Sequence, residues 1–217
     1  GVITAPDRPS GRGQKINYSS VKEYAIEKGL YLMQPTNLKD PNFIEELKNL
    51  KADVQIVVAF RMLPEVIWKI PSKGTLNLHA SLLPKYRGAA PINWAIINGE
   101  KETGVTTFLI EKKIDTGNII LQEKVSIEED ENAGHLHNKL MKMGSKLVCE
   151  TIDKIIEGKI EEKAQEGKAT QAPKIFKKDC QINWSDSIEN IHNFIRGLSP
   201  YPTAWSFIDD EQKQNIK

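Results

Sequence analysis

Two polar side chains stand two positions apart in an apolar segment and could act together on a carbonyl group. Residues 75–80 are predicted to form a buried strand, and Asn77 and His79 occupy alternate positions in it, so both side chains leave the same face. An amide donor and an imidazole on one face suit a carbonyl oxygen that gains negative charge during attack, because a fixed donor and a proton carrier stabilise that oxygen. The pair predicts an acyl-transfer site.

Asp115 is the predicted third member of this site. It precedes Thr116 and Gly117 in the loop after a predicted strand at 105–110. A carboxylate placed there could orient an imidazole and favour its charged form. The tripeptide is also a good turn sequence, which is the alternative interpretation. The same tripeptide occurs in aspartic proteases, but those are all-β proteins and the pattern of this chain is not.

The other histidines and the two cysteines do not form a second site in the sequence. His135 and His137 lie two apart on a predicted helix and point in nearly opposite directions, so they cannot share a ligand. His192 falls on the apolar stripe of the last predicted helix, where packing is the better interpretation. Cys149 and Cys180 give neither a disulfide framework nor a set of metal ligands. No metal site is predicted.

Composition sets wide bounds on function. The 217 residues, of which 39% are hydrophobic, are enough for one substantial core. The net charge of +1 indicates no global field that would attract a polyanion, so any contact with nucleic acid must come from local patches. No apolar segment reaches the length of a membrane span, and the cysteine usage is that of a reduced, cytoplasmic setting.

The periodicity alternates between strand and helix patterns, which is typical of an α/β sheet. The predicted strands are 30–34, 54–60, 75–80, 105–110 and 119–125, and the predicted helices are 21–28, 43–50, 64–69, 90–97, 133–156 and a last one from residue 185 or 186 to 197. The strand at 54–60 is apolar except for Gln55, so we expect burial on both faces. Asn132 is the predicted N-cap of the helix at 133–156. The last helix carries an apolar stripe, predicted to pack inward, of Ile188, Ile191, His192 and Ile195.

Several motifs together resemble the folate-dependent formyltransferases, over nearly the whole chain. The motifs are Asn77-Leu78-His79, Ser81-Leu82-Leu83-Pro84, Asp115-Thr116-Gly117 and Ile182-Asn183-Trp184-Ser185. A further segment, Pro6-Asp7-Arg8-Pro9, is similar to the branch of the family that acts on initiator tRNA.

The resemblance implies a Rossmann-like formyltransferase domain with a mostly parallel sheet. On that basis we expect residues 1–199 to be the catalytic domain, without the first strand-helix unit of the family. Residues 200–217 are expected to be a linker or the start of a C-terminal β-barrel domain that is largely absent. The sequence is thus interpreted as a fragment.

The implied activity is transfer of the formyl group of 10-formyltetrahydrofolate to the α-amino group of methionyl-initiator tRNA, for translation initiation. The folate is the formyl donor and co-substrate, and no metal is required. The catalytic residues would be Asn77, His79 and Asp115. The resemblance further implies a cytoplasmic enzyme, and we expect a monomer.

The resemblance also implies two binding regions. The expected folate contacts are Phe60, Met62, Leu63, Ser81, Leu82, Leu83 and Pro84. This chain departs from the common pattern of the family there, since it has Arg61 and one residue fewer before Leu63-Pro64. The expectation therefore concerns the site more than its individual contacts. The expected tRNA contacts are Arg8, Arg12 and Lys15, in a glycine-containing loop between residues 6 and 17, where guanidinium groups could fit phosphates. The alternative for this segment is a solvated flexible loop.

Three other functions share parts of this pattern. Another folate-dependent formyltransferase or a formyltetrahydrofolate hydrolase domain, acting on a small molecule, would have the same catalytic trio. A nucleotide-binding dehydrogenase would share a doubly wound sheet. A tRNA-binding module without catalysis would use only the basic loop.

Overall fold

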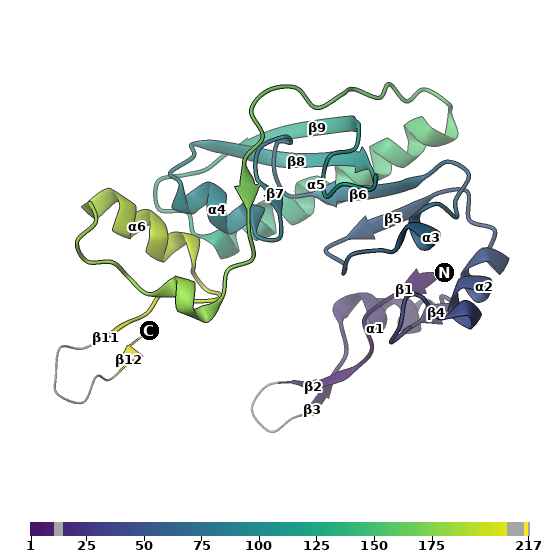
Figure 1. The fold of residues 1–217 in the computed structure, drawn as a ribbon, viewed down its shortest axis with the longest axis horizontal. Helices are drawn as coiled ribbons and strands as arrows, with labels where there is room; N and C mark the ends of the chain where they lie inside the picture. Colours follow the sequence, from purple (N-terminus) through teal and green to yellow (C-terminus); the bar gives the residue numbers. More distant parts are fainter. Residues whose placement is uncertain (11–14, 208–214, 217) are drawn as a thin grey trace. The chain divides into compact units, whose positions relative to one another are not determined.

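The computed structural model describes residues 1–10, 15–207 and 215–216 (Figure 1). Within them the chain forms two compact units. Unit 1 comprises residues 1–55 and 61–74, and unit 2 comprises residues 56–60 and 75–217. The predicted catalytic residues all belong to unit 2, and the predicted tRNA loop belongs to unit 1.

Unit 1 contains a short parallel strand pair and three helices. Its elements are β1 (Val2–Ile3), β4 (Leu32–Met33), α1 (Ser20–Glu27), α2 (Pro41–Asn49) and α3 (Glu65–Trp68), with β1 parallel to β4. The side chain of Ser19 caps α1, and that of Asp40 caps α2, where Pro41 occupies the first turn. Both helices were predicted from their periodicity, and this prediction is confirmed.

The segment around Arg8 and Lys15 is a hairpin. Strands β2 (Arg8–Ser10) and β3 (Lys15–Asn17) pair in antiparallel fashion, with Arg8 opposite Asn17 and Ser10 opposite Lys15. The sequence predicted no regular structure here. That prediction was wrong for residues 8–10 and 15–17, which form the two strands. Strands of three residues are too short to show an alternating pattern.

A four-stranded sheet is the centre of unit 2. Its strands are β5 (Gln55–Val58), β6 (Thr75–His79), β8 (Glu102–Leu109) and β9 (Ile119–Ser126), in the order β5-β6-β8-β9. Helix α5 (Ala133–Ile156) packs on one face (Figure 1). There a Cβ at Gly144 would lie 2.6 Å from Leu78, and the hydroxyls of Thr107 and Thr151 are 2.8 Å apart. The opposite face of β6 is therefore left for Asn77 and His79.

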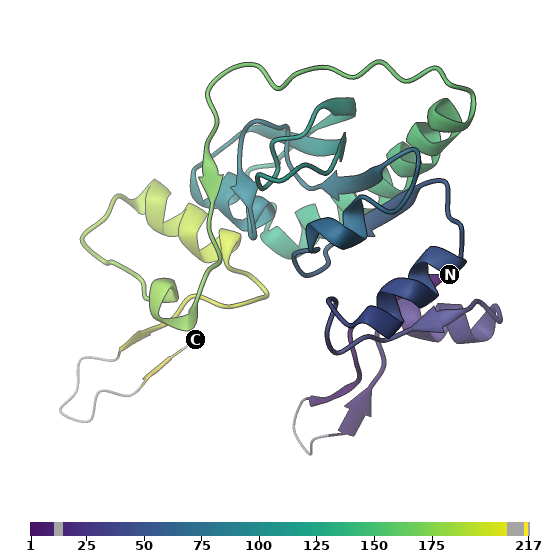
Figure 2. The same cartoon turned by 45° about the vertical axis from the view of Figure 1, so that its right-hand side comes forward.

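The remaining elements of unit 2 are short. They are β7 (Arg87–Gly88), α4 (Pro91–Ile97), β10 (Gln171–Ala172), a 3₁₀ turn (Lys177–Cys180), α6 (Ile188–Gly197), β11 (Ser206–Phe207) and β12 (Asn215–Ile216). After α5 the chain returns to β10, which lies parallel and next to β7 (Figure 2). Strands β11 and β12 are antiparallel. No helix among the described ranges is both long and apolar enough to cross a membrane.

The α/β class is confirmed, and the direction of strand pairing differs between segments. The sequence predicted a mostly parallel sheet. The pairs β1–β4 and β7–β10 are parallel, whereas β6–β8 and β8–β9 are antiparallel. The pair β8–β9 is connected by a loop of only residues 110–118, which is too short for the crossover that parallel strands need.

Two expectations about burial were wrong. Strand β5 was predicted to be buried on both faces, but Ile56 and Val58, which lie two apart and so share one face, are 41% and 54% exposed. The apolar stripe of α6 was predicted to pack inward, but Ile188 is 88% exposed. Helix α6 instead buries Asn193, Arg196 and Gly197. These polar groups are satisfied, since Arg196 donates to the carbonyl of Glu131 at 2.8 Å and to the Asn193 side chain at 2.9 Å.

Candidate active site

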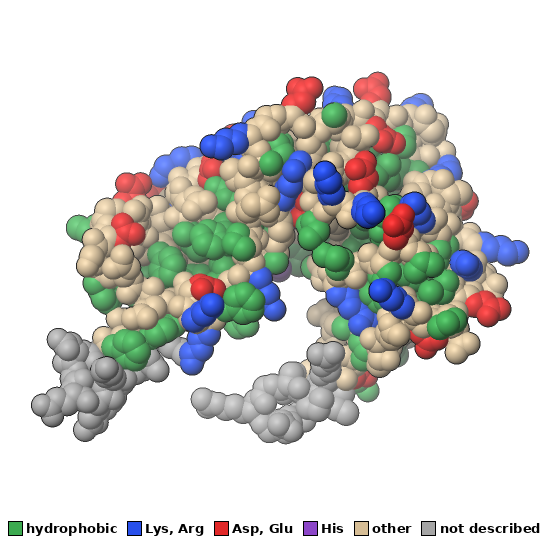
Figure 3. Space-filling view, in the orientation of Figure 1, with side chains coloured by type: hydrophobic (Ala, Val, Ile, Leu, Met, Phe, Trp, Pro, Cys, Tyr) green, Lys and Arg blue, Asp and Glu red, His purple; other side chains and the backbone are tan. Residues whose placement is uncertain are grey.

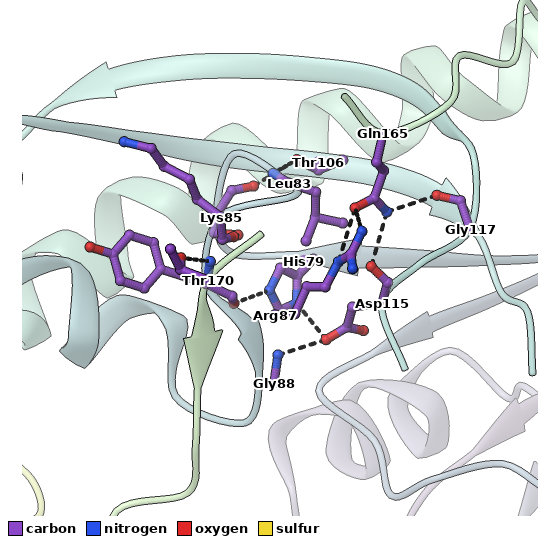
Figure 4. A network of polar contacts seen from close by, with 12 residues as sticks. His79, Leu83, Lys85, Arg87, Gly88, Thr106, Asp115, Gly117, Gln165 and Thr170 are labelled. Atoms are coloured by element: carbon purple, nitrogen blue, oxygen red, sulfur yellow. Dashed lines mark hydrogen bonds and ion pairs between the residues drawn. The ribbon is translucent and has the colours of Figure 1, made fainter. Parts of the chain in front are cut away.

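His79 ends strand β6 and is buried, with 6% of its surface exposed. Its Nε2 atom lies 2.9 Å from the carbonyl oxygen of Tyr86 (Figure 4). A carbonyl can only accept, so Nε2 carries a hydrogen and donates it. Nδ1 is therefore the ring nitrogen that remains for other partners.

Asp115 faces that nitrogen. Its Oδ2 atom lies 3.8 Å from His79 Nδ1, which is within the range of an ion pair but longer than a hydrogen bond. The same oxygen accepts a hydrogen bond of 2.8 Å from the backbone N–H of Gly88. Side-chain exposures of 7% for His79 and 13% for Asp115 leave the pair little water to screen it. The predicted partners are thus brought together.

The turn that carries Asp115 is sterically demanding. Asp115 has a positive φ of 52°, in the left-handed region that few residue types adopt readily. Two residues later, a Cβ at Gly117 would stand 1.7 Å from the carbonyl oxygen of Leu109, so only glycine fits. The turn signal in the sequence was correct, and this turn also presents the carboxylate to His79.

Asn77 lies on the same face of β6 as His79. Asn77 pairs with Phe108 and His79 with Thr106 on strand β8, whereas Leu78, between them, points to α5. Asn77 is half-buried. Among the described residues its side-chain amide has no hydrogen-bond partner, so both its donor and its acceptor remain open to a ligand.

Thr106 fixes the loop that follows β6. Its buried hydroxyl donates to the carbonyl of Ser81 at 2.6 Å and accepts from the backbone N–H of Leu83 at 3.2 Å. It also accepts a 2.9 Å hydrogen bond from Gln122 Nε2. One side chain thus holds both sides of the turn after His79.

Tyr86 positions the carbonyl that binds His79. The ring is 5% exposed, and its hydroxyl donates to Glu100 Oε1 at 2.8 Å and accepts from Asn98 at 3.2 Å. Burial raises the pKa of Tyr86 to about 12, so the phenol stays neutral at physiological pH. The Tyr86 backbone has a φ of 59°. The neutral phenol, held by two hydrogen bonds, keeps this backbone in place.

The residues predicted to bind folate have different surroundings. Phe60 and the segment 81–84 belong to unit 2, and Met62 and Leu63 belong to unit 1. Met62 is 74% exposed, and Phe60, Leu63, Leu82 and Pro84 are partly exposed. Ser81 is fully buried and its hydroxyl donates to the Lys85 carbonyl at 2.6 Å, while Leu83 packs on Phe108 and Ile119. The side chains of Ser81 and Leu83 are thus occupied by contacts within the protein. A folate contact at these residues would therefore involve backbone atoms.

The residues predicted to bind tRNA lie in unit 1. Arg8 and Lys15 belong to the strands of the hairpin, and Arg12 lies outside the described residues. The base of the hairpin is anchored at Asp7, which accepts hydrogen bonds from Lys22 and from Gln34. The hydrogen bond from Lys22 is the main cause that lowers the pKa of Asp7, so this anchor is charged at neutral pH.

Gln165, which lies beside the site, had no signal in the sequence. Gln165 donates to the carbonyls of Asp115 and Gly117 and accepts two hydrogen bonds from Arg87 (Figure 4). Its segment is polar and without periodicity, so nothing in the sequence separates it from a solvated connection. Its partners are between 48 and 78 residues away in the chain, and only the fold brings them together.

The described surface in Figure 3 carries charges of both signs. Lys and Arg side chains are mixed with Asp and Glu on the face shown in Figure 3, in agreement with the net charge of +1. Within the described residues, no three His, Cys, Asp or Glu side chains are placed to hold a metal ion.

Comparison with known proteins agrees with the motifs. The family described as formyl transferase matches residues 1–152, and its C-terminal domain matches residues 174–217. Methionyl-tRNA formyltransferase of Bacteroides fragilis is 57% identical over 211 residues, which are 95% of this chain and 65% of that protein. The enzyme of that name from Flavobacterium johnsoniae is 58% identical over 99% of this chain and 69% of its own length.

Solved structures share the fold at low sequence identity. A 4-N formyltransferase from Francisella tularensis superposes with a TM-score of 0.73 and 22% identity, covering 91% of this chain and 81% of that one. HypX from Aquifex aeolicus, crystallised in complex with tetrahydrofolic acid, has a TM-score of 0.68 and 20% identity, covering 85% of this chain and 32% of its own. With a family match over residues 1–152 and relatives above 50% identity over nearly its whole length, this chain belongs to the formyl transferase family.

Proposed function

We propose that the full-length protein transfers the formyl group of 10-formyltetrahydrofolate to the α-amino group of methionyl-initiator tRNA. The observation that carries this proposal is the buried His79, whose Nδ1 faces Asp115 at 3.8 Å. On the same face of β6 lies Asn77, whose side-chain amide has no hydrogen-bond partner among the residues that the structure describes. This arrangement supports acyl transfer, and the relatives named methionyl-tRNA formyltransferase support the acceptor. The chain spans about two thirds of the length of those relatives, so the proposal concerns the whole protein.

The reaction begins when the unprotonated α-amine attacks the formyl carbon of the donor. The carbonyl oxygen becomes an oxyanion, which the Asn77 amide and the Nδ1–H of protonated His79 stabilise. The Asp115 carboxylate orients His79 and assists removal of a proton from the attacking nitrogen. The bond between the formyl carbon and N10 then breaks, and N10 gains a proton, so the products are formylmethionyl-tRNA and tetrahydrofolate.

Two binding regions complete the proposal. The folate would contact the partly exposed residues Phe60, Met62, Leu63, Leu82 and Pro84, with the backbone of Ser81 and Leu83. The tRNA acceptor end would contact the β2–β3 hairpin through Arg8, Arg12 and Lys15. The catalytic domain would end near residue 199, and the protein would act as a monomer in the cytoplasm.

An acceptor comparison tests the proposal. The full-length protein is incubated with labelled 10-formyltetrahydrofolate in four parallel reactions. Each contains one acceptor, which is methionyl-initiator tRNA, the uncharged tRNA, an amino sugar nucleotide or water alone. We expect label only on the methionyl group of the charged tRNA. Equal release of formate in every reaction would indicate a hydrolase instead, and label on the sugar would indicate a small-molecule formyltransferase.

A further inference from the structure

The segment Gln165–Ala172, which we call the strap, lies between the two family matches, which end at residue 152 and resume at residue 174. It connects α5 with the C-terminal part of unit 2. In Figures 1 and 2 the chain after α5 returns across unit 2, and its end, β10, lies beside β7. The strap is thus next to the loop that contacts the candidate active site.

Hydrogen bonds of the backbone, one of them to the Thr170 hydroxyl, attach the strap to this loop, residues 84–90. The distances between donor and acceptor atoms are between 2.8 and 3.3 Å. The hydrogen bonds run from Thr170 N to Pro84 O, Tyr86 N to Thr170 Oγ1, Arg87 N to Thr170 O, Ala89 N to Ala172 O and Ala90 N to Ala172 O. Approach is close enough that a Cβ at Gly88 would lie 2.6 Å from the Ala172 carbonyl oxygen. The loop therefore depends on the strap for its conformation.

The same loop contacts both titratable residues of the site. Tyr86 supplies the carbonyl that accepts from His79 Nε2, and Gly88 supplies the N–H that binds Asp115 Oδ2. Tyr86 itself also binds the strap, and Gly88 lies between Arg87 and Ala89, which both bind it. A shift of the strap would consequently reach His79 and Asp115.

Gln165 makes the most direct connection. Its Nε2 donates to the carbonyl of Asp115 at 2.9 Å and to that of Gly117 at 2.8 Å. Its Oε1 accepts from Arg87 Nη2 at 2.6 Å and from Nε at 3.1 Å (Figure 4). Only an amide can donate to two carbonyls while accepting from a guanidinium, since a carboxylate cannot donate and an ammonium cannot accept.

We propose that Gln165 is a positioning residue, which holds the Asp115 turn and Arg87 so that the Asp115 carboxylate faces His79. This inference rests on the proposed function, in which Asp115 acts on His79. The backbone of Asp115 has a φ of 52°, and such a conformation persists only where the surroundings fix it. The amide of Gln165 binds the carbonyl of that strained residue itself and the carbonyl two residues later, at Gly117.

The test uses Gln165→Glu in the full-length protein, with Gln181→Glu, the same change at an exposed position, as the control. A carboxylate at 165 faces two carbonyl oxygens and loses both donors. We expect kcat for methionyl-tRNA formylation to fall about tenfold or more, while KM for both substrates stays within about threefold. The control should keep wild-type kinetics.

A double-mutant cycle separates positioning from general structure. If Gln165 acts through Asp115, Gln165→Glu should lower kcat by less than about threefold in an Asp115→Asn background, because the group it positions is gone. If the full tenfold loss recurs there, the effect is independent of Asp115 and the proposal is wrong.

The amide signal of Gly88 in NMR gives a readout that needs no activity. In Gln165→Met, which keeps the volume and removes the hydrogen bonds, that proton should shift upfield and exchange faster, since Asp115 no longer holds it. An unchanged signal in a folded Gln165→Met protein would overturn the proposal. Should the wild type fail to formylate methionyl-tRNA, the proposed function fails, whereas this signal still decides the role of Gln165.

Discussion

The two ring nitrogens of His79 have different surroundings, and this division defines the chemistry open to the residue. Nε2 is committed to the Tyr86 carbonyl at 2.9 Å, and Nδ1 faces Asp115 at 3.8 Å. Proton exchange with a substrate is therefore confined to Nδ1. A buried histidine with one nitrogen fixed by a backbone carbonyl keeps the other in a constant direction, which is the preorganisation that acyl transfer needs.

Asp115→Asn tests the carboxylate at constant size. The asparagine oxygen can still accept from the Gly88 N–H, so the turn should survive, but the negative charge beside His79 is lost. We expect kcat to fall tenfold or more with an unchanged circular dichroism spectrum, whereas Asp153→Asn, at an exposed site on α5, should have no effect. Turnover at the wild-type rate would show that Asp115 is only a turn residue.

Because of Tyr86, the stability of the folded protein should depend on pH in the alkaline range. The ordinary tyrosine pKa is about 10, and burial raises that of Tyr86 to about 12. Between these values the unfolded chain loses this proton while the folded chain retains it, so the free energy of unfolding should fall as pH rises from about 10 to 12. Urea unfolding at several pH values measures this. Tyr86→Phe should flatten the dependence, and Tyr201→Phe, at a residue 81% exposed, should not.

At this scale the sequence predicted the residues to which we assign the chemistry, and it missed residues whose hydrogen-bond partners are distant in the chain. Asn77 and His79 could be paired because a strand repeats every two residues. Gln165 and Thr106 could not be found, because an amide or hydroxyl in a polar or apolar run gives no sign of which backbone groups it will bind. The catalytic roles of His79 and Asp115 remain predictions, which His79→Ala and Asp115→Asn test.

The turn at 115–117 is the element on which the site depends most. Gly117→Ala would place a Cβ 1.7 Å from the Leu109 carbonyl oxygen, so the turn or strand β8 must shift. We expect a loss of roughly 2 kcal/mol in the free energy of unfolding, measured with urea, together with reduced turnover. Thr116→Ala, which adds no atom near Leu109, is the control. Equal stability of Gly117→Ala and the wild type would show that the turn has other conformations available.

Elements were predictable where they are long. Helix α5 has the predicted bounds, 133–156, with Asn132 as its N-cap, because 24 residues give several helical turns of periodic pattern and a capping signal. Strands of two residues, such as β7 and β10, have no period to detect and arise from pairing with each other. On α6 an apolar stripe was visible, but a Cβ at Gly197 would lie 2.6 Å from Ile97, and this close approach buries a different face.

For the whole molecule, the net charge of +1 confines any nucleic-acid contact to local groups. If Arg12 contacts the acceptor arm, Arg12→Ala in the full-length protein should raise KM for methionyl-tRNA and flatten its salt dependence, since one phosphate contact fewer releases fewer counterions. KM for the folate should stay constant, and Lys146→Ala on α5 serves as a control for the loss of one positive charge. A KM and salt slope identical to wild type would remove Arg12 from the proposed interface.

The most direct measurement is single-turnover formyl transfer from labelled 10-formyltetrahydrofolate to methionyl-initiator tRNA by the full-length protein and its His79→Ala variant. His137→Ala, an exposed histidine on α5, is the matched control. Loss of a donor to the oxyanion predicts a rate lower by about a hundredfold or more for His79→Ala, with folate affinity within a few fold and the control unchanged. A His79→Ala rate within threefold of wild type would contradict the account.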